Sequence, residues 1–187
     1  MITLATTNVG KARELARLLE VPVEPLDGWD PPPEDGATFE ANALIKAREA
    51  RVQAPPGVTV LADDSGLEVE ALGGEPGVHS ARFGGPGLDD AGRVRHLLAR
   101  LEGVDDRRAR FVCVLALIGP GGDQTIVEGV LEGTIASAPR GAGGFGYDPV
   151  FVPHGEDRTV AELAPEEKDA ISHRGRAARA LAAELEP

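Results

Sequence analysis

Residues 109–119 read ARFVCVLALIG and residues 125–136 read TIVEGVLEGTIA, with Gly119-Pro120-Gly121-Gly122-Asp123 between the two runs. Both runs are rich in β-branched and apolar residues, which is typical of buried strands. Two such runs joined by a short connection containing Gly and Pro predict a long antiparallel β-hairpin. This hairpin decides the fold class, because it adds antiparallel strands to a chain whose first half favours parallel ones.

The chain before the hairpin alternates strand and helix signals, which is the pattern of parallel βα units. In chain order these are a strand at 2–6, a helix at 11–19, a short strand at 21–24 in a Pro-rich loop, a helix capped by Thr38 and running through Ala54, strands at 58–62 and 67–72 with a turn between them, and a helix at 88–101. The assignments rest on hydrophobic periodicity, on helix caps and on Gly and Pro as breakers.

The chain after the hairpin carries a glycine-rich loop at 141–146, a short strand at 150–152 and a helix that Ser172 caps and that runs to about residue 185. Parallel units, then a hairpin, then a closing helix predict an α/β protein with a mixed sheet. A length of 187 residues suits one domain over residues 1–187, and it is sufficient to bury a sizeable core.

Composition restricts the class of partner. The chain has 19 Lys and Arg against 31 Asp and Glu, a net charge of −12. Such acidity argues against non-specific binding to nucleic acid or to an anionic membrane surface, although small anionic ligands respond to local charge. The basic residues are 16 Arg and only three Lys, namely Lys11, Lys46 and Lys168.

Cys113 is alone, so neither an internal disulfide nor a cysteine zinc site is expected. No signal peptide or transmembrane run is evident, and we expect a cytoplasmic protein.

The first stretch whose residues are suited to binding or catalysis is Thr6-Thr7-Asn8-Val9-Gly10-Lys11, between a predicted strand and a predicted helix. Such a junction offers unpaired backbone N–H groups and the positive end of a helix, which together form a natural anion site. Thr6 and Thr7 add hydroxyls, Asn8 adds an amide and Lys11 adds a point charge suited to phosphate. The alternative is that Asn8 only caps the helix and Lys11 is exposed.

The second stretch is Asp63-Asp64-Ser65-Gly66, at the end of an apolar run. Two adjacent carboxylates are costly to keep ionised there unless cations or strong donors compensate them. Successive residues of an extended chain point to opposite sides, so one Asp can meet a metal while its neighbour anchors the loop. The alternative is a plain Asp-Asp-Ser-Gly turn. Glu40 is a further candidate metal ligand, or a solvated helix residue.

The third stretch, Gly141-Ala142-Gly143-Gly144-Phe145-Gly146, matches the dinucleotide-binding pattern letter for letter. The pattern requires a following helix, whereas Pro149 disfavours a helical conformation at Asp148, so the dinucleotide interpretation fails. What remains is a flexible loop presenting Phe145, Tyr147 and Asp148. Two of the chain's seven aromatic residues in such a loop indicate a platform for stacking a base beside a polar group.

The fourth stretch is Lys168-Asp169-Ala170-Ile171-Ser172-His173-Arg174. With Ser172 as N-cap, His173 and Arg174 fall at a helix start, where cations are unfavourable against the helix dipole. Such placement indicates that they face an anion or a carbonyl-bearing ligand. A solvated helix start is the alternative.

Together these stretches resemble the inosine triphosphate pyrophosphatase family, which hydrolyses non-standard purine nucleoside triphosphates such as dITP and XTP. The matching residues are Thr6-Thr7-Asn8 with Lys11 and Glu14, Thr38-Phe39 with Asn42-Ala43 and Lys46-Ala47, Ala62 to Leu67, Gly77 to Phe83, Gly144 to Phe151, and Ser172 to Gly175. Each motif is weak alone, but six in order at compatible spacing are highly specific.

The resemblance implies a two-lobed α/β fold around a long mixed sheet flanked by helices, with a cleft between the lobes, a homodimer, Mg²⁺, and products that are the nucleoside monophosphate and pyrophosphate. It places Asp64 as base and metal ligand, with Asp63 as a further candidate ligand. The positions it implies for substrate binding are Thr6, Thr7, Asn8, Lys11, Ser65, Phe145, Gly146, Tyr147, Asp148, Lys168, His173 and Arg174.

One departure from the family pattern concerns the metal. Many relatives carry a Glu directly before Asn42, where this chain has Ala41, with its Glu at position 40. One residue on a helix turns a side chain by about 100°, so either water takes the place of that ligand or Glu40 reaches the metal from a shifted helix start.

The resulting functional expectation is Mg²⁺-dependent hydrolysis of dITP, ITP, XTP and dXTP, which cleanses the nucleotide pool. Donors on His173 or Arg174 would favour a 6-oxo purine over adenine, whose amino group is itself a donor. The alternatives are a nucleotide-binding sensor that does not hydrolyse, and a related pyrophosphatase for modified pyrimidine nucleotides.

Overall fold

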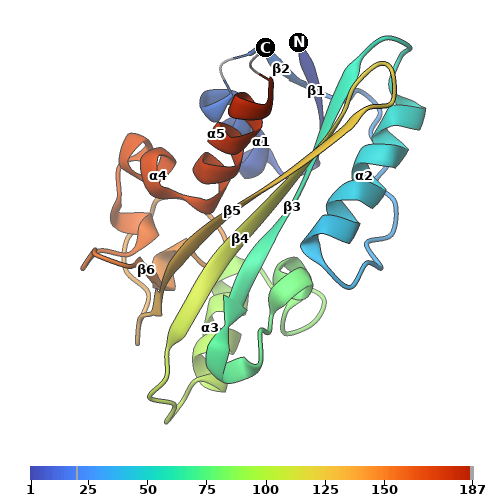
Figure 1. Cartoon of the computed structure of the whole chain (residues 1–187). Helices are drawn as coiled ribbons and strands as arrows, with labels where there is room; N and C mark the ends of the chain where they lie inside the picture. The colour runs from blue at the N-terminus through green and yellow to red at the C-terminus, as the bar shows by residue number, and fades with distance from the viewer. Residues whose placement is uncertain (20, 186–187) are drawn as a thin grey trace. The chain divides into compact units, whose positions relative to one another are not determined.

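An eleven-residue strand, β3 (Thr59–Val69), carries the Asp-Asp pair in the interior of the sheet. The computed structural model describes residues 1–19 and 21–185, and in these residues six strands form one sheet in the order β2-β1-β3-β4-β5-β6 (Figure 1). The other strands are β1 (Ile2–Ala5), β2 (Val23–Pro25), β4 (Arg108–Ile118), β5 (Gln124–Ile135) and β6 (Phe151–Pro153).

The sheet is mixed, which confirms the predicted α/β class. Strand β1 pairs in parallel with both β2 and β3, whereas β5 and β6 are antiparallel. Strands β4 and β5 are neighbours joined by a tight turn in which the Gly122 N–H donates to the carbonyl of Gly119. The predicted hairpin is therefore present.

Capping side chains fix where the helices begin. Asn8, Thr38 and Asp89 each accept a hydrogen bond from the backbone N–H three residues further along the chain. Ser172 does the same for the last helix, since its Oγ accepts from Gly175 N at 3.0 Å. The caps predicted at Thr38 and Ser172 are thereby confirmed.

The α-helices are α1 (Val9–Leu18), α2 (Phe39–Gln53), α3 (Asp90–Arg100), α4 (Pro165–Ile171) and α5 (His173–Leu185). The sequence analysis did not predict α4 or the 3₁₀ segment Gly77–Arg82. No helix in residues 1–19 and 21–185 is long and apolar enough to cross a membrane.

The described chain divides into two compact units. The first contains residues 1–65, 113–130 and from 172 onward, and the second contains residues 66–112 and 131–171. The first unit has its own apolar core, in which Leu4, Leu15, Leu61, Leu115 and Leu181 are almost fully buried. A single domain over residues 1–187 stays a prediction.

The second unit has a separate apolar core. Leu67, Leu97, Leu101, Val150 and Phe151 are fully buried in it, and Phe151 stacks at a tilt on Phe111 with 4.4 Å between ring centroids. Each unit therefore buries apolar surface of its own, which is the main favourable contribution to folding.

The predicted turn between strands at 58–62 and 67–72 is wrong. Strand β3 runs without interruption from Thr59 to Val69, and residues 70–72 form a 3₁₀ turn. The expectation failed because Asp, Ser and Gly are typical turn residues, and Asp63 to Gly66 consist of these residues alone. Buried carboxylates are tolerated where cations and donors compensate them, and both have such partners.

Candidate active site

Asp63 and Asp64 lie side by side on β3 and meet different partners. Their exposed fractions are 1% and 5%. Asp63 contacts cations from α1 and α5, whereas Asp64 contacts a cation from α2. Figure 1 shows α1 and α5 on one side of the first unit's strands and α2 on the other. The alternation of side chains along a strand thus separates the two carboxylates.

The Asp63 carboxylate is held by two cations. Its Oδ2 lies 2.9 Å from Lys11 Nζ and 3.8 Å from Arg174 Nη2. Burial alone would raise the pKa of Asp63, but these cations hold the pKa well below its usual range. Asp63 is therefore ionised at any pH at which the protein would operate.

Arg174 is the largest fully buried side chain of the first unit, with 2% exposure. Its Nη1 donates to the Glu14 carboxylate, and its Nη2 donates to Ser65 Oγ at 3.0 Å. Burial would lower the pKa of Arg174, but the nearby anions raise it. The guanidinium thus links α5 to α1 and to β3.

The two oxygens of the Asp64 carboxylate differ in their contacts. Its Oδ1 accepts from Lys46 Nζ at 3.0 Å, while its buried Oδ2 has no hydrogen-bond partner among the described residues. Burial raises the pKa of Asp64, and the Lys46 ammonium acts in the opposite direction. An unsatisfied buried carboxylate oxygen is costly, so it is a candidate ligand or proton acceptor.

Glu34 is a residue that the sequence analysis missed. It lies in the loop before α2, and its Oε1 contacts Lys46 Nζ at 2.7 Å. Burial would lower the pKa of Lys46, but the carboxylates of Asp63, Asp64 and Glu34 raise it. The only sequence signal for Glu34 is a carboxylate in a Pro-rich loop just ahead of a helix.

Hydrogen bonds order residues 6–11, the stretch predicted to bind phosphate, around the start of α1. Asn8 Oδ1 accepts from Lys11 N at 3.0 Å, and Thr6 Oγ1 accepts from Asn8 N at 3.1 Å. Thr7 and Asn8 are exposed. Asn8 does cap the helix, but the Lys11 side chain is only 16% exposed and points to Asp63.

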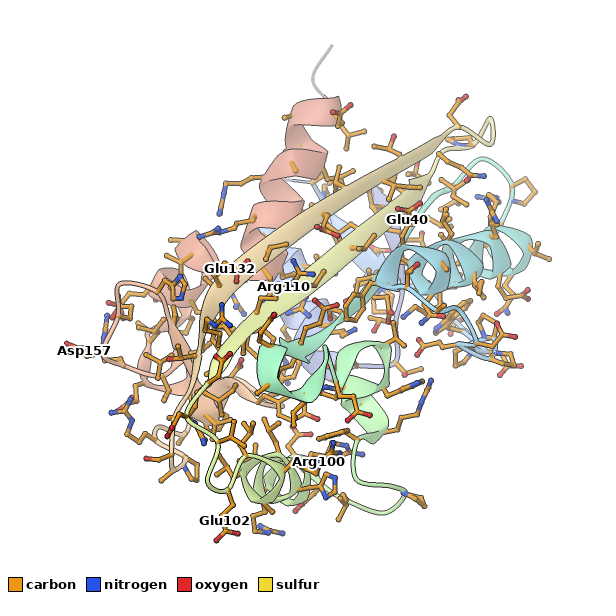
Figure 2. The ribbon with its side chains drawn as sticks, turned by 60° about the horizontal axis from the view of Figure 1, so that its bottom comes forward. Glu40, Arg100, Glu102, Arg110, Glu132 and Asp157 are labelled. Carbon is orange, nitrogen blue, oxygen red and sulfur yellow. The ribbon has the colours of Figure 1, made fainter. Side chains whose placement is uncertain are left out.

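Glu40 is exposed on the first turn of α2 (Figure 2). Within residues 1–19 and 21–185, no group of three or more His, Cys, Asp and Glu side chains is placed to hold a metal ion. Asp63, Asp64 and Glu40 therefore do not form a three-carboxylate metal site in this structure. The helix starts at Phe39, so Glu40 keeps the outward position that its register gives it.

The second unit brings Phe145, Asp148 and Lys168 together. Asp148 Oδ2 accepts from Phe145 N at 2.9 Å and from Lys168 Nζ at 2.7 Å. The same Nζ lies 5.0 Å from the centroid of the Phe145 ring, within the range of a cation–π contact. The cluster combines an aromatic ring, an ammonium and a carboxylate.

The loop of this cluster is fixed, whereas the sequence analysis expected it to be flexible. The Gly146 N–H donates to Asp90 Oδ2 at 2.7 Å, and Tyr147 is 5% exposed, with its hydroxyl donating to the Ser80 carbonyl at 2.8 Å. Gly144 has φ +71°, and a Cβ there would lie 2.0 Å from Asp148 Oδ2. Tyr147 thus packs in the core of the unit, and its hydrogen bond to Ser80 anchors the loop to that core.

Ser172, His173 and Arg174 lie at the start of α5 and are all buried. Gly129 on β5 lets this helix start approach the sheet, because a Cβ at Gly129 would lie 2.1 Å from the His173 carbonyl oxygen and 2.4 Å from Ala177 N. The position of α5 therefore depends on a glycine in a strand that is distant in the sequence.

The sequence of this chain matches a known protein family and several of its members. A model of the Ham1 family matches residues 2–184. A dITP/XTP pyrophosphatase from Symbiobacterium thermophilum is 54% identical over 182 residues, covering 94% of this chain and 90% of the relative. Another, from Syntrophobacter fumaroxidans, is 51% identical over 193 residues, covering 100% of this chain and 82% of the relative.

A solved structure shares the fold. The structure of a HAM1 protein from Coxiella burnetii superposes with a TM-score of 0.87 at 46% sequence identity, covering 98% of this chain and 97% of that chain. The predicted mixed sheet flanked by helices is thereby confirmed.

Proposed function

Because the chain belongs to the Ham1 family, we propose that it is a nucleoside triphosphate pyrophosphatase that hydrolyses dITP and XTP to the nucleoside monophosphate and pyrophosphate. The observation that carries the proposal is the pair of buried carboxylates on β3, each with its own cation, beside the helix N-terminus at Asn8. We take dITP and XTP as the substrates because the relatives are named for them.

A sensor that binds nucleotide without hydrolysing it is the alternative from another class. Two buried carboxylates close to a polyanion would weaken binding unless they serve chemistry. The buried, unsatisfied Oδ2 of Asp64 favours an enzyme, because it costs stability and gains a role only with a water or a cation.

We assign the triphosphate to the loop before α1. The exposed side chains of Thr7 and Asn8 and the backbone N–H groups of the first helical turn offer donors to phosphate oxygens. Lys11 and the positive helix end would stabilise the charge that grows on the leaving pyrophosphate. Thr6 shapes the loop by accepting from Asn8 N.

The residues around Asp64 fit Mg²⁺, a hard cation that prefers carboxylate oxygens and water. Asp64 Oδ2 supplies an oxygen that lacks a partner among the described residues, and the Glu34 carboxylate shares the Lys46 ammonium with Asp64. When bound, Mg²⁺ would neutralise charge on the phosphates. We propose Asp64 and Glu34 as its ligands, and Glu40 is too exposed to be preferred.

Asp64 is also the proposed base. Burial raises the pKa of Asp64, which makes it a better proton acceptor than an ordinary carboxylate, and the Lys46 ammonium opposes that rise by donating to Oδ1. Water attacks the α-phosphorus and gives its proton to Asp64, and the bond from that phosphorus to the bridging oxygen breaks as pyrophosphate leaves.

We assign base recognition to Phe145, Gly146, Asp148 and Lys168, and we keep His173 as a proposed substrate-binding residue of the first unit. The Phe145 ring offers a stacking face, and the Lys168 ammonium offers a donor to a 6-oxo group. Adenine presents a donor at that position, which would leave two donors facing each other. Arg174 and Tyr147 would act by holding Ser65 and the loop, respectively.

The test is product analysis with dITP and Mg²⁺. The proposal expects equimolar dIMP and pyrophosphate. Release of orthophosphate would show that the terminal phosphate is cleaved, which contradicts the proposed cleavage between the α- and β-phosphates. Absence of any product at every pH would favour the sensor. Comparison of kcat/KM for ITP, XTP, GTP, ATP and modified pyrimidine triphosphates separates the remaining alternative. We further propose that the enzyme is a cytoplasmic homodimer.

A further inference from the structure

The loop that carries Glu34 is attached to α2 by its backbone. Asn42, which is fully buried on α2, accepts a hydrogen bond at its Oδ1 from the Gly36 N–H at 2.8 Å. The approach is close, because a Cβ at Gly36 would lie 2.6 Å from Asn42 Oδ1 and 2.9 Å from Ala41 Cβ. Only glycine fits position 36 without a shift of loop or helix.

The same loop is attached to α2 a second time through Glu34. The Glu34 carboxylate contacts Lys46 Nζ at 2.7 Å, and Lys46 lies one helical turn after Asn42. Lys46 in turn contacts Asp64 Oδ1 at 3.0 Å. Asn42 and Lys46 therefore fix the backbone and the side chain of one short segment beside Asp64.

Helix stability does not explain the choice of Asn at position 42. Thr38 already caps α2, with its Oγ1 accepting from Ala41 N at 3.1 Å, and the Asn42 N–H bonds to the Thr38 carbonyl. The buried Nδ2 of Asn42 has no hydrogen-bond partner among the described residues, so an amide here carries an unsatisfied donor. An apolar side chain would avoid that cost.

We propose that Asn42 is a positioning residue that, through the Gly36 N–H, holds Glu34 beside Asp64 for binding a divalent cation. The inference rests on the proposed function. Asn42 touches neither cation nor substrate, and its contribution is the placement of a carboxylate. Residues that orient metal ligands typically change metal affinity by about 10- to 100-fold when they are replaced.

The experiment compares Asn42→Ala with the wild-type chain in two measurements. One is the Mg²⁺ concentration that gives half-maximal dITP hydrolysis, and the other is Mn²⁺ binding without nucleotide, followed by the electron paramagnetic resonance of free Mn²⁺. The expected result is about 10-fold weaker metal affinity in both, with kcat largely recovered at saturating Mg²⁺.

Gly36→Ala tests the same contact from the loop side, and it leaves Asn42 in place. It is expected to weaken Mn²⁺ binding similarly, and the double variant is expected to be little worse than either single one, because both break one contact. Thr38→Ala is the matched control. It removes a comparable bond at the same helix start, so it lowers the melting temperature and leaves Mn²⁺ affinity unchanged.

Unchanged metal affinity in both Asn42→Ala and Gly36→Ala would overturn the inference and leave the proposed function intact. An equal loss in Thr38→Ala would also overturn it, since the effect would then be general damage to the helix start. Wild-type hydrolysis without any divalent cation would instead contradict the metal-dependent part of the proposed function.

Discussion

The ammonium of Lys11 lies 2.9 Å from Oδ2 of the buried Asp63. The other two lysines repeat this relationship, since Lys46 contacts Asp64 and Lys168 contacts Asp148. In a chain that otherwise uses Arg, each Lys therefore places a compact ammonium on a buried aspartate. A guanidinium is larger, planar and harder to fit in the same space.

Lys11→Arg is expected to lower kcat/KM for dITP by about 10-fold or more although it preserves charge, because a bidentate fork cannot replace the single short contact. Steady-state kinetics measure the effect. Arg13→Lys, at an exposed position of the same helix, is the control and should leave kcat/KM unchanged. Near-normal activity of Lys11→Arg would show that only the charge matters.

Glu14→Gln is expected to destabilise the fold by about 3–5 kcal/mol, because it removes the Glu14 carboxylate that accepts from Nη1 of the buried Arg174 guanidinium. Urea unfolding measures the change. The control is Glu68→Gln, which removes the charge of a carboxylate that contacts Arg110, whose side chain is 50% exposed, and it should cost at most about 1 kcal/mol. Equal losses in the two variants would contradict the buried pair's importance.

Gly129→Ala is expected to destabilise the fold by about 1–3 kcal/mol, because the new Cβ would overlap the His173 carbonyl and force α5 away from β5. Gly119→Ala is the control, since its Cβ would meet nothing closer than 3.9 Å. Thermal unfolding of the two variants decides. A Gly129→Ala chain as stable as the control would mean that α5 does not rest on the sheet here.

The Cys113 thiol is expected to resist alkylation by iodoacetamide at pH 8 in the folded protein. Burial raises its pKa to about 12, so the reactive thiolate is scarce below that pH. The unfolded chain has the lower, ordinary pKa, so this group favours the folded state below about pH 9 and loses that contribution as pH rises toward 12. Rapid labelling of native protein at pH 8 would contradict the burial.

Local signals predicted most of the fold. The hairpin follows from composition and a short turn, and the helix beginning after Thr38 follows from one capping side chain. The continuity of β3 was not predictable in the same way. It depends on Lys11, Lys46 and Arg174, which reach Asp63 and Asp64 from distant parts of the chain.

In the candidate site, too, residues in local motifs were predictable from the sequence, and residues defined by distant contacts were not. Asp63, Asp64 and Lys11 were recognisable because their motifs are local, whereas Glu34 becomes visible only through its contact with Lys46. The Arg174 interaction with Glu14 spans 160 positions, so the sequence could not show which carboxylate this buried cation contacts.

The most direct test of the account is pyrophosphate release from dITP by Asp64→Asn, compared with the wild-type chain at equal folded fraction. We expect a loss of about 10²- to 10⁴-fold in kcat, because the amide cannot accept the proton of water. Release of pyrophosphate by Asp64→Asn at near the wild-type rate would contradict it.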